Sequence, residues 1–274
     1  MRFVRFGERG QERPGFLDAD GHLRDLSEQI DSWSGGVRGR VEQRRPEGPL
    51  VDGQPRLGPP VEGVGKIVCI GKNYADHAAE MGSSAPKEPM IFMKATSAIN
   101  GPSDPIVLPR GASMTDYEAE LAVVIGKRAK YISAEEAPGV IAGYTILNDV
   151  TERDYQYNRA GQYTKGKSCD SFAPLGPWLV TPDEIADPQN LAVRLSVNGD
   201  LRQDGSTAQM LHGVMALISY LSDFFSFEPG DILSTGTPSG VAHGMDPPGY
   251  IRAGDVVTCR IEGLGQQENP VIQD

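Results

Sequence analysis

The chain has 274 residues, and its 26 basic and 37 acidic side chains give a net charge of -11 at pH 7. This charge argues against a nucleic-acid partner, because such binding needs a basic surface. The three cysteines are widely separated, so neither a disulfide framework nor a thiolate zinc site is predicted. The first residues lack the apolar run of a secretory signal and no stretch suits a membrane span, so a soluble, cytoplasmic protein is expected.

Residues 1–64 predict a small N-terminal domain and linker. They open with an alternating, strand-like run and end in the Pro/Gly-rich stretch EGPLVDGQPRLGPPVEG. From residue 65 the pattern changes to regular strands, which marks residues 65–274 as a second and larger domain. These strands are expected at residues 66–71, 89–94, 116–126, 143–149, 191–203, 230–238 and 254–262.

Helices are few in the expected fold. One is predicted at about 133–142, where Ser133 and Glu136 have capping-box spacing, and another at about 151–159. The clearest spans 212–225, where apolar residues recur at helical spacing. Strands and helices do not alternate strictly, and Asn198-Gly199 indicates a hairpin. The fold class is therefore α+β and mainly β, with a mostly antiparallel sheet.

Two carboxylates, Glu118 and Glu120, stand two residues apart at the start of an apolar strand, so both should lie on one face. A third, Asp149, follows the strand at 143–149. Three oxygen donors suit a hard cation such as Mg²⁺ or Mn²⁺, with Ca²⁺ also compatible. The same pattern is also typical of a solvated strand face, and Asp149 of a helix N-cap.

The segment GKNYADHAAE reads as a loop that enters a short helix, where His77 and Glu80 share a face. A carboxylate beside an imidazole suits a general base, although a surface ion pair gives the same spacing. Further along, Lys165 and Lys167 precede a turn-rich stretch, and a lysine aimed at an acidic site would stabilise an oxyanion. We find no G-x-G-x-x-G after a strand, no P-loop, no G-x-S-x-G and no H-E-x-x-H.

Six motifs taken in order resemble the fumarylacetoacetate hydrolase family over residues 65–274. They are GKNYADHAAE, DYEAELAVVIGK, GYTILNDVTERDYQ, KGKSCDSFAPLGPWLV, VNGDLRQ and GDILSTGTPSGV. The resemblance implies a mixed β-sandwich or β-roll catalytic domain, usually dimeric. It also implies a divalent metal on Glu118, Glu120 and Asp149.

The resemblance further implies that His77 and Glu80 form a water-activating dyad on a lid ordered by substrate. The family lysine falls on Lys167. Family substrate contacts fall on Arg153, Gln156 and Thr237. The activity expected from this set is hydrolysis of a carbon–carbon bond in a 2,4-dioxo acid, an acylpyruvate or a 2,4-diketo-3-deoxy sugar acid, which releases pyruvate.

Other reactions occur on the same scaffold, so the reaction is less fixed than the fold. Oxaloacetate decarboxylase, ureidoglycolate lyase and dienoate isomerase activities stay open. A non-enzymatic alternative is a ligand-binding protein with a degenerate site. The distal half of the substrate depends on the pocket walls, because polar walls favour a sugar acid and apolar walls an acyl or aryl pyruvate.

Overall fold

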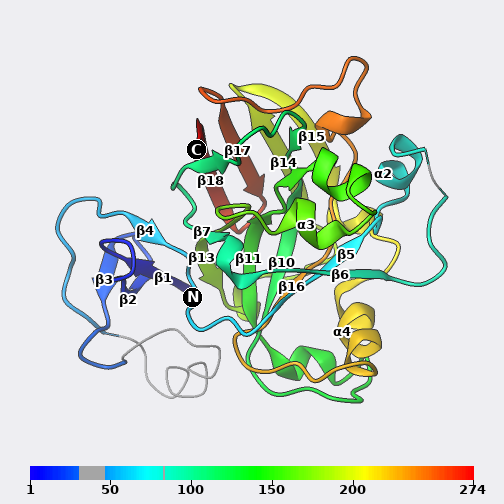
Figure 1. The fold of residues 1–274 in the computed structure, drawn as a ribbon. Helices are drawn as coiled ribbons and strands as arrows, with labels where there is room; N and C mark the ends of the chain where they lie inside the picture. The colour runs from blue at the N-terminus through cyan, green and yellow to red at the C-terminus, as the bar shows by residue number, and fades with distance from the viewer. Residues whose placement is uncertain (31–46, 83) are drawn as a thin grey trace.

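The computed structural model describes residues 1–30, 47–82 and 84–274. Strands dominate this part of the chain, which confirms the mainly β fold (Figure 1). The N-terminal half contributes β1 (Arg2–Phe6), β2 (Arg13–Leu17), β3 (Leu23–Asp25), β4 (Leu57–Gly58), β5 (Ile67–Gly71), β6 (Met90–Lys94), β7 (Ile99–Asn100), β8 (Ile106–Leu108), β9 (Thr115–Asp116) and β10 (Ala119–Ile125). The remaining strands are β11 (Ile141–Asn148), β12 (Thr151–Glu152), β13 (Ala173–Val180), β14 (Ala192–Val197), β15 (Asp200–Ser206), β16 (Ile232–Ser234), β17 (Val256–Ile261) and β18 (Gly265–Gln273).

The helices of the described residues are short. The α-helices are α2 (Ala75–Glu80), α3 (Tyr163–Lys167) and α4 (Val214–Ser222), and residues Asp154–Asn158 form a wider π-helical turn, η3. Single 3₁₀ turns lie at η1 (Thr96–Ala98), η2 (Ala137–Val140), η4 (Pro182–Glu184), η5 (Thr207–Gln209) and η6 (Ala242–Gly244). No helix among these residues is long and apolar enough to cross a membrane.

Two large sheets pack against each other. The larger runs β3-β2-β1-β13-β11-β10-β16-β5-β6, and the smaller runs β15-β14-β17-β18-β8. Most pairs are antiparallel, as predicted, and β16 pairs with β5 in parallel. The strands β10 and β11 are buried along their whole length. This burial explains their continuous apolar sequences, because a strand covered on both faces needs no polar alternation.

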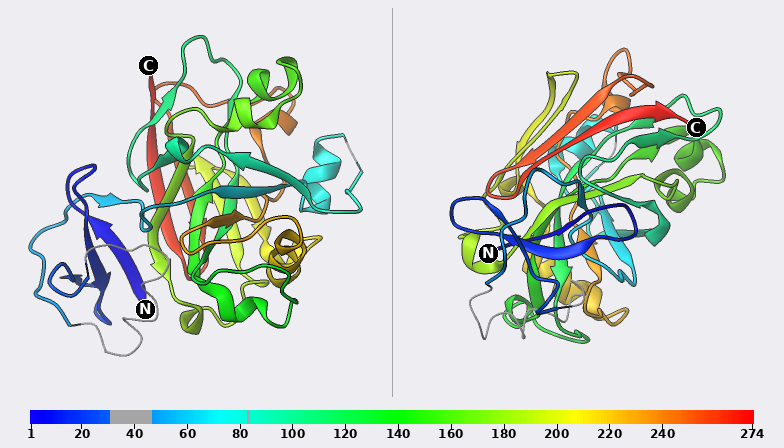
Figure 2. Two further views of the ribbon diagram at one scale, coloured as in Figure 1. Left: turned by 60° about the horizontal axis from the view of Figure 1, so that its bottom comes forward. Right: turned by 90° about the vertical axis from the view of Figure 1, so that its left-hand side faces the viewer.

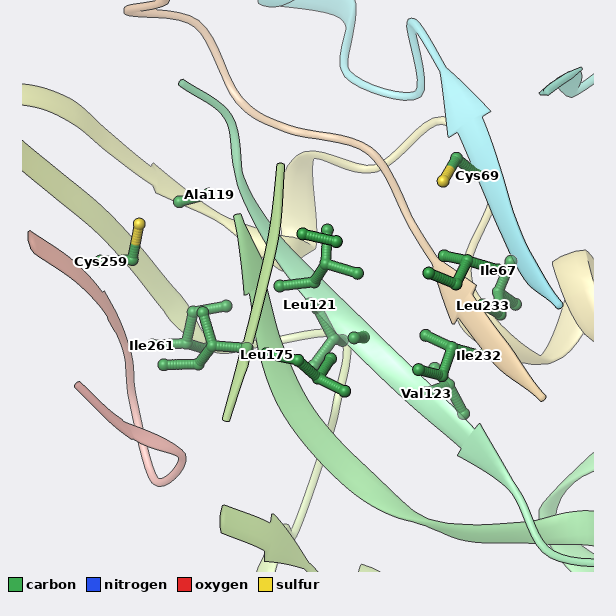
Figure 3. Close-up of a cluster of buried hydrophobic side chains, with 14 of the residues drawn as sticks. Ile67, Cys69, Ala119, Leu121, Val123, Leu175, Ile232, Leu233, Cys259 and Ile261 are labelled. Atoms are coloured by element: carbon green, nitrogen blue, oxygen red, sulfur yellow. The ribbon is translucent and has the colours of Figure 1, made fainter. Parts of the chain in front are cut away.

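The main core lies between the two sheets. Figure 3 shows Leu121 of β10 and Leu175 of β13 near Cys259 and Ile261 of β17. On β18 the buried amide of Gln267 donates to backbone carbonyls of the larger sheet, including that of Ile146 at 2.9 Å. The sheets therefore hold β10 and β11, and the carboxylates at their ends, on a rigid base.

The first three strands extend the larger sheet through β1, which pairs with β13. In Figures 1 and 2 these strands, drawn in blue, lie at the opposite end of the molecule from α2. The predicted N-terminal domain lies partly outside the described residues, because residues 31–46 are not described. Its Pro/Gly-rich stretch at 47–63 is described and contains β4. The boundary near residue 64 stays a prediction.

Two of the three predicted helices differ from the structure. Residues 133–142 form a turn and η2 before β11 begins at Ile141, because Pro138 and Gly139 interrupt any longer helix. Residues 151–159 start with β12 and only then turn into η3. The third prediction is confirmed by α4, whose Leu217 and Leu221 face the core. The hairpin is also confirmed, since β14 and β15 are joined by Asn198 and Gly199, both with positive φ.

Candidate active site

One small cavity opens between the ends of β5, β6 and β10 and the helical segments α2, η3 and α3. Seven of the nine side chains singled out in the sequence line it: His77, Glu118, Glu120, Arg153, Gln156, Lys167 and Thr237. The other two, Glu80 and Asp149, contact lining residues directly. The cavity volume is about 20 Å³, which is room for roughly one water molecule.

The three predicted metal ligands come together. Oxygen atoms of Glu118, Glu120 and Asp149 all lie within 4.8 Å of one another, and all three side chains are buried. Glu118 and Glu120 stand at the start of β10, and Asp149 follows the adjacent strand β11. The carboxylate of Asp149 accepts hydrogen bonds from lysines within the site, so the N-cap interpretation of this residue is not supported.

Three cations surround these carboxylates. Lys167 Nζ donates to Glu118 Oε2 at 2.9 Å and to Asp149 Oδ2 at 2.7 Å. Lys94 Nζ donates to the other oxygen of Asp149 at 2.6 Å, and Arg153 Nη2 donates to Glu118 Oε1 at 2.7 Å. These bonds stabilise two of the three carboxylates in the absence of bulk water.

The third carboxylate is in a different environment. Oε2 of Glu120 accepts from the Ser234 hydroxyl at 2.6 Å and the Gly236 amide at 2.9 Å, both uncharged donors. Burial and the negative charges of Asp149 and Glu118 raise the pKa of Glu120 well above its ordinary value. By contrast, burial would raise the pKa of Glu118, but the charges of Lys167 and Arg153 outweigh it and hold that pKa at about 2.

This arrangement fits a hard divalent cation. The donors are all carboxylate oxygens, they converge on one point, and Glu120 carries a like-charge repulsion that a cation would relieve. The group also borders a cavity, so a bound ion would keep positions open for a small ligand.

His77 and Glu80 lie on α2. His77 Nδ1 lies 3.4 Å from Glu80 Oε2, which fits the predicted pair. Glu80 in turn accepts from the Gly240 amide at 2.9 Å. Both side chains are largely buried, with exposed fractions of 8% and 17%, so a simple surface ion pair does not describe them.

Arg153 and Gln156 lie on one side of η3 and are hydrogen-bonded to each other at 2.9 Å. Gln156 accepts through Oε1, so its amide nitrogen is the atom left to meet a ligand. Thr237 lines the cavity with its hydroxyl held by the Ala119 carbonyl at 2.9 Å and by Gln203. Lys165 is exposed and donates to the Arg159 carbonyl, away from this group.

Three site residues were not predicted. Asp116 accepts from Arg153 Nε at 2.8 Å, and its period-two spacing with Glu118 is a signal that could have found it. Lys94 ends the otherwise apolar run PMIFMK, a weaker signal. Tyr157 lines the cavity and stacks on His243, with ring centroids 5.5 Å apart, and nothing in its sequence context marks this role.

Comparison with known proteins finds one matching family model, the C-terminal domain of fumarylacetoacetate (FAA) hydrolase, over residues 66–272. A curated relative from Sphingomonas sp. (strain SKA58), 2,4-didehydro-3-deoxy-L-rhamnonate hydrolase, is 49% identical over 99% of this chain and 96% of its own length.

Solved structures resemble the whole chain. A fumarylacetoacetate hydrolase from Exiguobacterium antarcticum is 39% identical and covers 100% of both chains with a TM-score of 0.88. A 5-carboxymethyl-2-hydroxymuconate delta-isomerase from Mycobacterium smegmatis is 36% identical and covers 100% of this chain and 99% of its own, with a TM-score of 0.79. The relatives therefore include both a hydrolase and an isomerase.

Proposed function

This chain belongs to the fumarylacetoacetate hydrolase family and is a hydrolase, and we propose that it cleaves a carbon–carbon bond in a 2,4-dioxo acid to give pyruvate and a carboxylic acid. The observation that carries the proposal is the convergence of acid, base and cation on one cavity. Glu118, Lys167 and His77 line it together, although they come from distant parts of the sequence.

We propose Glu118, Glu120 and Asp149 as the ligands of a divalent metal, Mg²⁺ or Mn²⁺. Their convergence within 4.8 Å and the raised pKa of Glu120 support this assignment. When bound, such a metal supplies Lewis-acid polarisation of the 2-oxo acid end of the substrate. The carboxylate of that end would meet Arg153, Gln156 and Thr237, which line the same cavity.

In the hydrolytic step, His77 acts as the general base. Its Nδ1 faces Glu80, which leaves Nε2 as the nitrogen that removes a proton from water. The resulting hydroxide adds to carbon 4, and Lys167 stabilises the negative charge that develops on the carbonyl oxygen. The bond between carbons 3 and 4 then breaks, its electron pair passes to carbon 3, and carbon 3 takes up the proton from His77.

The relative supports the substrate class. The name of the Sphingomonas relative gives its substrate as a 2,4-didehydro-3-deoxy sugar acid. Because that relative is 49% identical over 99% of this chain, we propose that this chain acts on a related 2,4-diketo-3-deoxy sugar acid.

A panel assay tests the reaction. With Mg²⁺ or Mn²⁺ present, pyruvate release would be followed on acylpyruvates, 2,4-dioxo-3-deoxy sugar acids and oxaloacetate. Glyoxylate release from ureidoglycolate and the ultraviolet absorbance of a dienoate would be followed in parallel. We expect pyruvate from at least one dioxo acid. Turnover of the dienoate or oxaloacetate alone would replace hydrolysis with isomerisation or decarboxylation.

The substitution His77→Ala tests the base. Removing a positioned general base lowers turnover by about 10²- to 10⁴-fold, and we expect this loss in kcat with unchanged metal affinity. Single-turnover assays and calorimetry with Mn²⁺ measure the two quantities. A variant with the wild-type rate would remove His77 from the mechanism.

The metal assignment has its own test. Glu118→Ala and Asp149→Ala each delete one proposed ligand, so both should weaken Mn²⁺ binding in calorimetry by about 10-fold or more, which corresponds to about 1.4 kcal/mol. Glu228 offers a control, since Glu228→Ala removes an exposed carboxylate that does not line the cavity. Undiminished affinity in both site variants would rule out this metal site.

The assembly is also a proposal. We infer a cytoplasmic homodimer, as the family resemblance implies. Light scattering on the purified chain would give its mass in solution.

A further inference from the structure

The Glu80 side chain is held by a segment far away in the sequence, residues 239–244, which we call the Glu80 seat. Both its carboxylate oxygens accept from the amide of Gly240, at 2.9 Å and 3.2 Å. Gly240 has a φ of +103°, and a side chain there would overlap the Arg202 carbonyl. Glycine is therefore required for this amide to face Glu80.

A second glycine leaves room for the same side chain. A Cβ on Gly244 would fall on Glu80 Cγ and lie 2.5 Å from its Cδ and 2.8 Å from its Oε1. Those three Glu80 atoms are the nearest neighbours of that position. The φ of Gly244 is in the range that other residues adopt, so the closest obstacle to alanine at this position is the Glu80 side chain.

The same segment holds the start of α2. The Ser239 hydroxyl donates to Asp76 Oδ2 at 2.8 Å, so residues 239–244 contact both carboxylates of α2. In Figures 1 and 2, α2 and the orange segment after β16 lie side by side at the same edge.

The seat is itself fixed to the active site. Asp116 accepts from the amides of Ala242 and His243, at 2.7 Å and 3.0 Å, and also from Arg153. Asp116 is fully buried, so these bonds are shielded from water and hold the segment in one conformation.

We propose that Gly240 and Gly244 are positioning residues. They fix the position of the Glu80 carboxylate, and through it they orient His77. This inference rests on the proposed role of His77 as the base. The seat acts on the reaction only by fixing the direction of the imidazole, because neither glycine contacts the cavity. A misplaced base lowers turnover while leaving substrate and metal binding intact.

The test uses Gly244→Ala in the full-length chain with Mn²⁺. We expect kcat to fall by about 10²-fold, with KM and the calorimetric Mn²⁺ affinity changed by less than about 2-fold. Gly139→Ala is the matched control, since a Cβ there meets nothing within 4 Å and its φ is also ordinary. Hydrogen exchange of residues 75–80 is measured in parallel, and we expect it to rise in Gly244→Ala alone.

A double-mutant cycle separates positioning from general damage. Glu80→Ala removes the side-chain atoms with which Gly244→Ala would overlap. In the Glu80→Ala background, Gly244→Ala should therefore alter kcat by less than about 2-fold. An equal loss in both backgrounds, or a Gly244→Ala variant with wild-type rate and exchange, would overturn the inference. If the wild-type protein cleaves no dioxo acid, the proposed function fails. The hydrogen exchange of residues 75–80 in Gly244→Ala and in the wild-type protein still decides whether Gly244 fixes the position of Glu80.

Discussion

Lys94 is the residue whose role was least visible in the sequence. Its side chain has no exposed surface, and its Nζ donates to Asp149 Oδ1 at 2.6 Å and to the Val150 carbonyl at 3.1 Å. Asp149 is equally buried, with Lys167 on its second oxygen. The two lysines therefore share one carboxylate, Lys167 on the cavity side and Lys94 behind it.

Lys94→Met should destabilise the protein. Removing one partner of a buried ion pair leaves an uncompensated charge and costs about 3–5 kcal/mol. Urea unfolding in the presence of a chelator measures this loss of unfolding free energy. The exposed Lys127→Met is the control, with an expected change within about 0.5 kcal/mol. Equal stability of both variants would mean that Lys167 alone compensates Asp149.

Single residues were predictable where spacing carried information. Glu118 and Glu120 alternate along a strand, so their shared face followed from geometry. Their meeting with Asp149 and Lys167 depends on pairing between β10 and β11 and on the approach of α3, which are tertiary contacts. The decision between a metal site and a solvated strand face therefore came from the family resemblance. Lys94 was missed because no local pattern distinguishes it.

Among the elements, α2 is the one whose local stability bears on the entry of substrate into the cavity. It has six residues, and both of its carboxylates, Asp76 and Glu80, accept hydrogen bonds from residues 239 and 240. The cavity beneath it has room for roughly one water molecule, which is far less than a 2,4-dioxo acid needs. We therefore predict that α2, which carries the lining residue His77, moves when substrate enters.

Hydrogen exchange tests this movement. In the wild-type protein we expect the amides of α2 to exchange faster than those of β10, because local opening is easiest where few buried contacts hold an element. Oxalate with Mn²⁺, a mimic of the 2-oxo acid end, should slow exchange in α2 and leave α4 unchanged. Protection of α2 equal to that of β10 without oxalate would argue for a rigid entrance.

Element prediction succeeded where apolar periodicity was regular. The α4 helix buries Val214, Leu217 and Leu221 on one side, and the sequence displays that spacing. The strands β13 and β18 were not predicted. β13 contains Pro174 and Pro177, and β18 carries polar side chains that are buried through tertiary hydrogen bonds, so neither shows ordinary strand alternation.

On the scale of the whole molecule, Arg56 joins the N-terminal strands to the catalytic region. It donates to Glu12 Oε1 at 2.9 Å and to Asp104 at 2.7 Å and 2.6 Å. Burial would raise the pKa of both carboxyls, but the hydrogen bonds and charge of Arg56 outweigh it, and both pKa values are lowered. The mainly β fold followed from composition and strand pattern, whereas this long-range pair did not, because nothing local relates Arg56 to Asp104.

A lowered carboxyl pKa stabilises the folded state above the unfolded pKa of about 4, and this stability is lost as pH falls through the folded value. Arg56→Met removes the main cause. It leaves the largely buried Asp104 without its cation and Glu12 with only the more distant Arg5, at 3.5 Å, so we expect a loss of about 2–3 kcal/mol at pH 7. The difference from wild type should shrink below about pH 5, as the unpaired carboxyls become protonated and neutral. Unfolding free energies at pH 7, 5 and 4 measure it, with Arg128→Met, which breaks an exposed pair, as the control expected to lose about 0–1 kcal/mol. A difference that stays constant over this range would show that Arg56 acts through packing and not through charge.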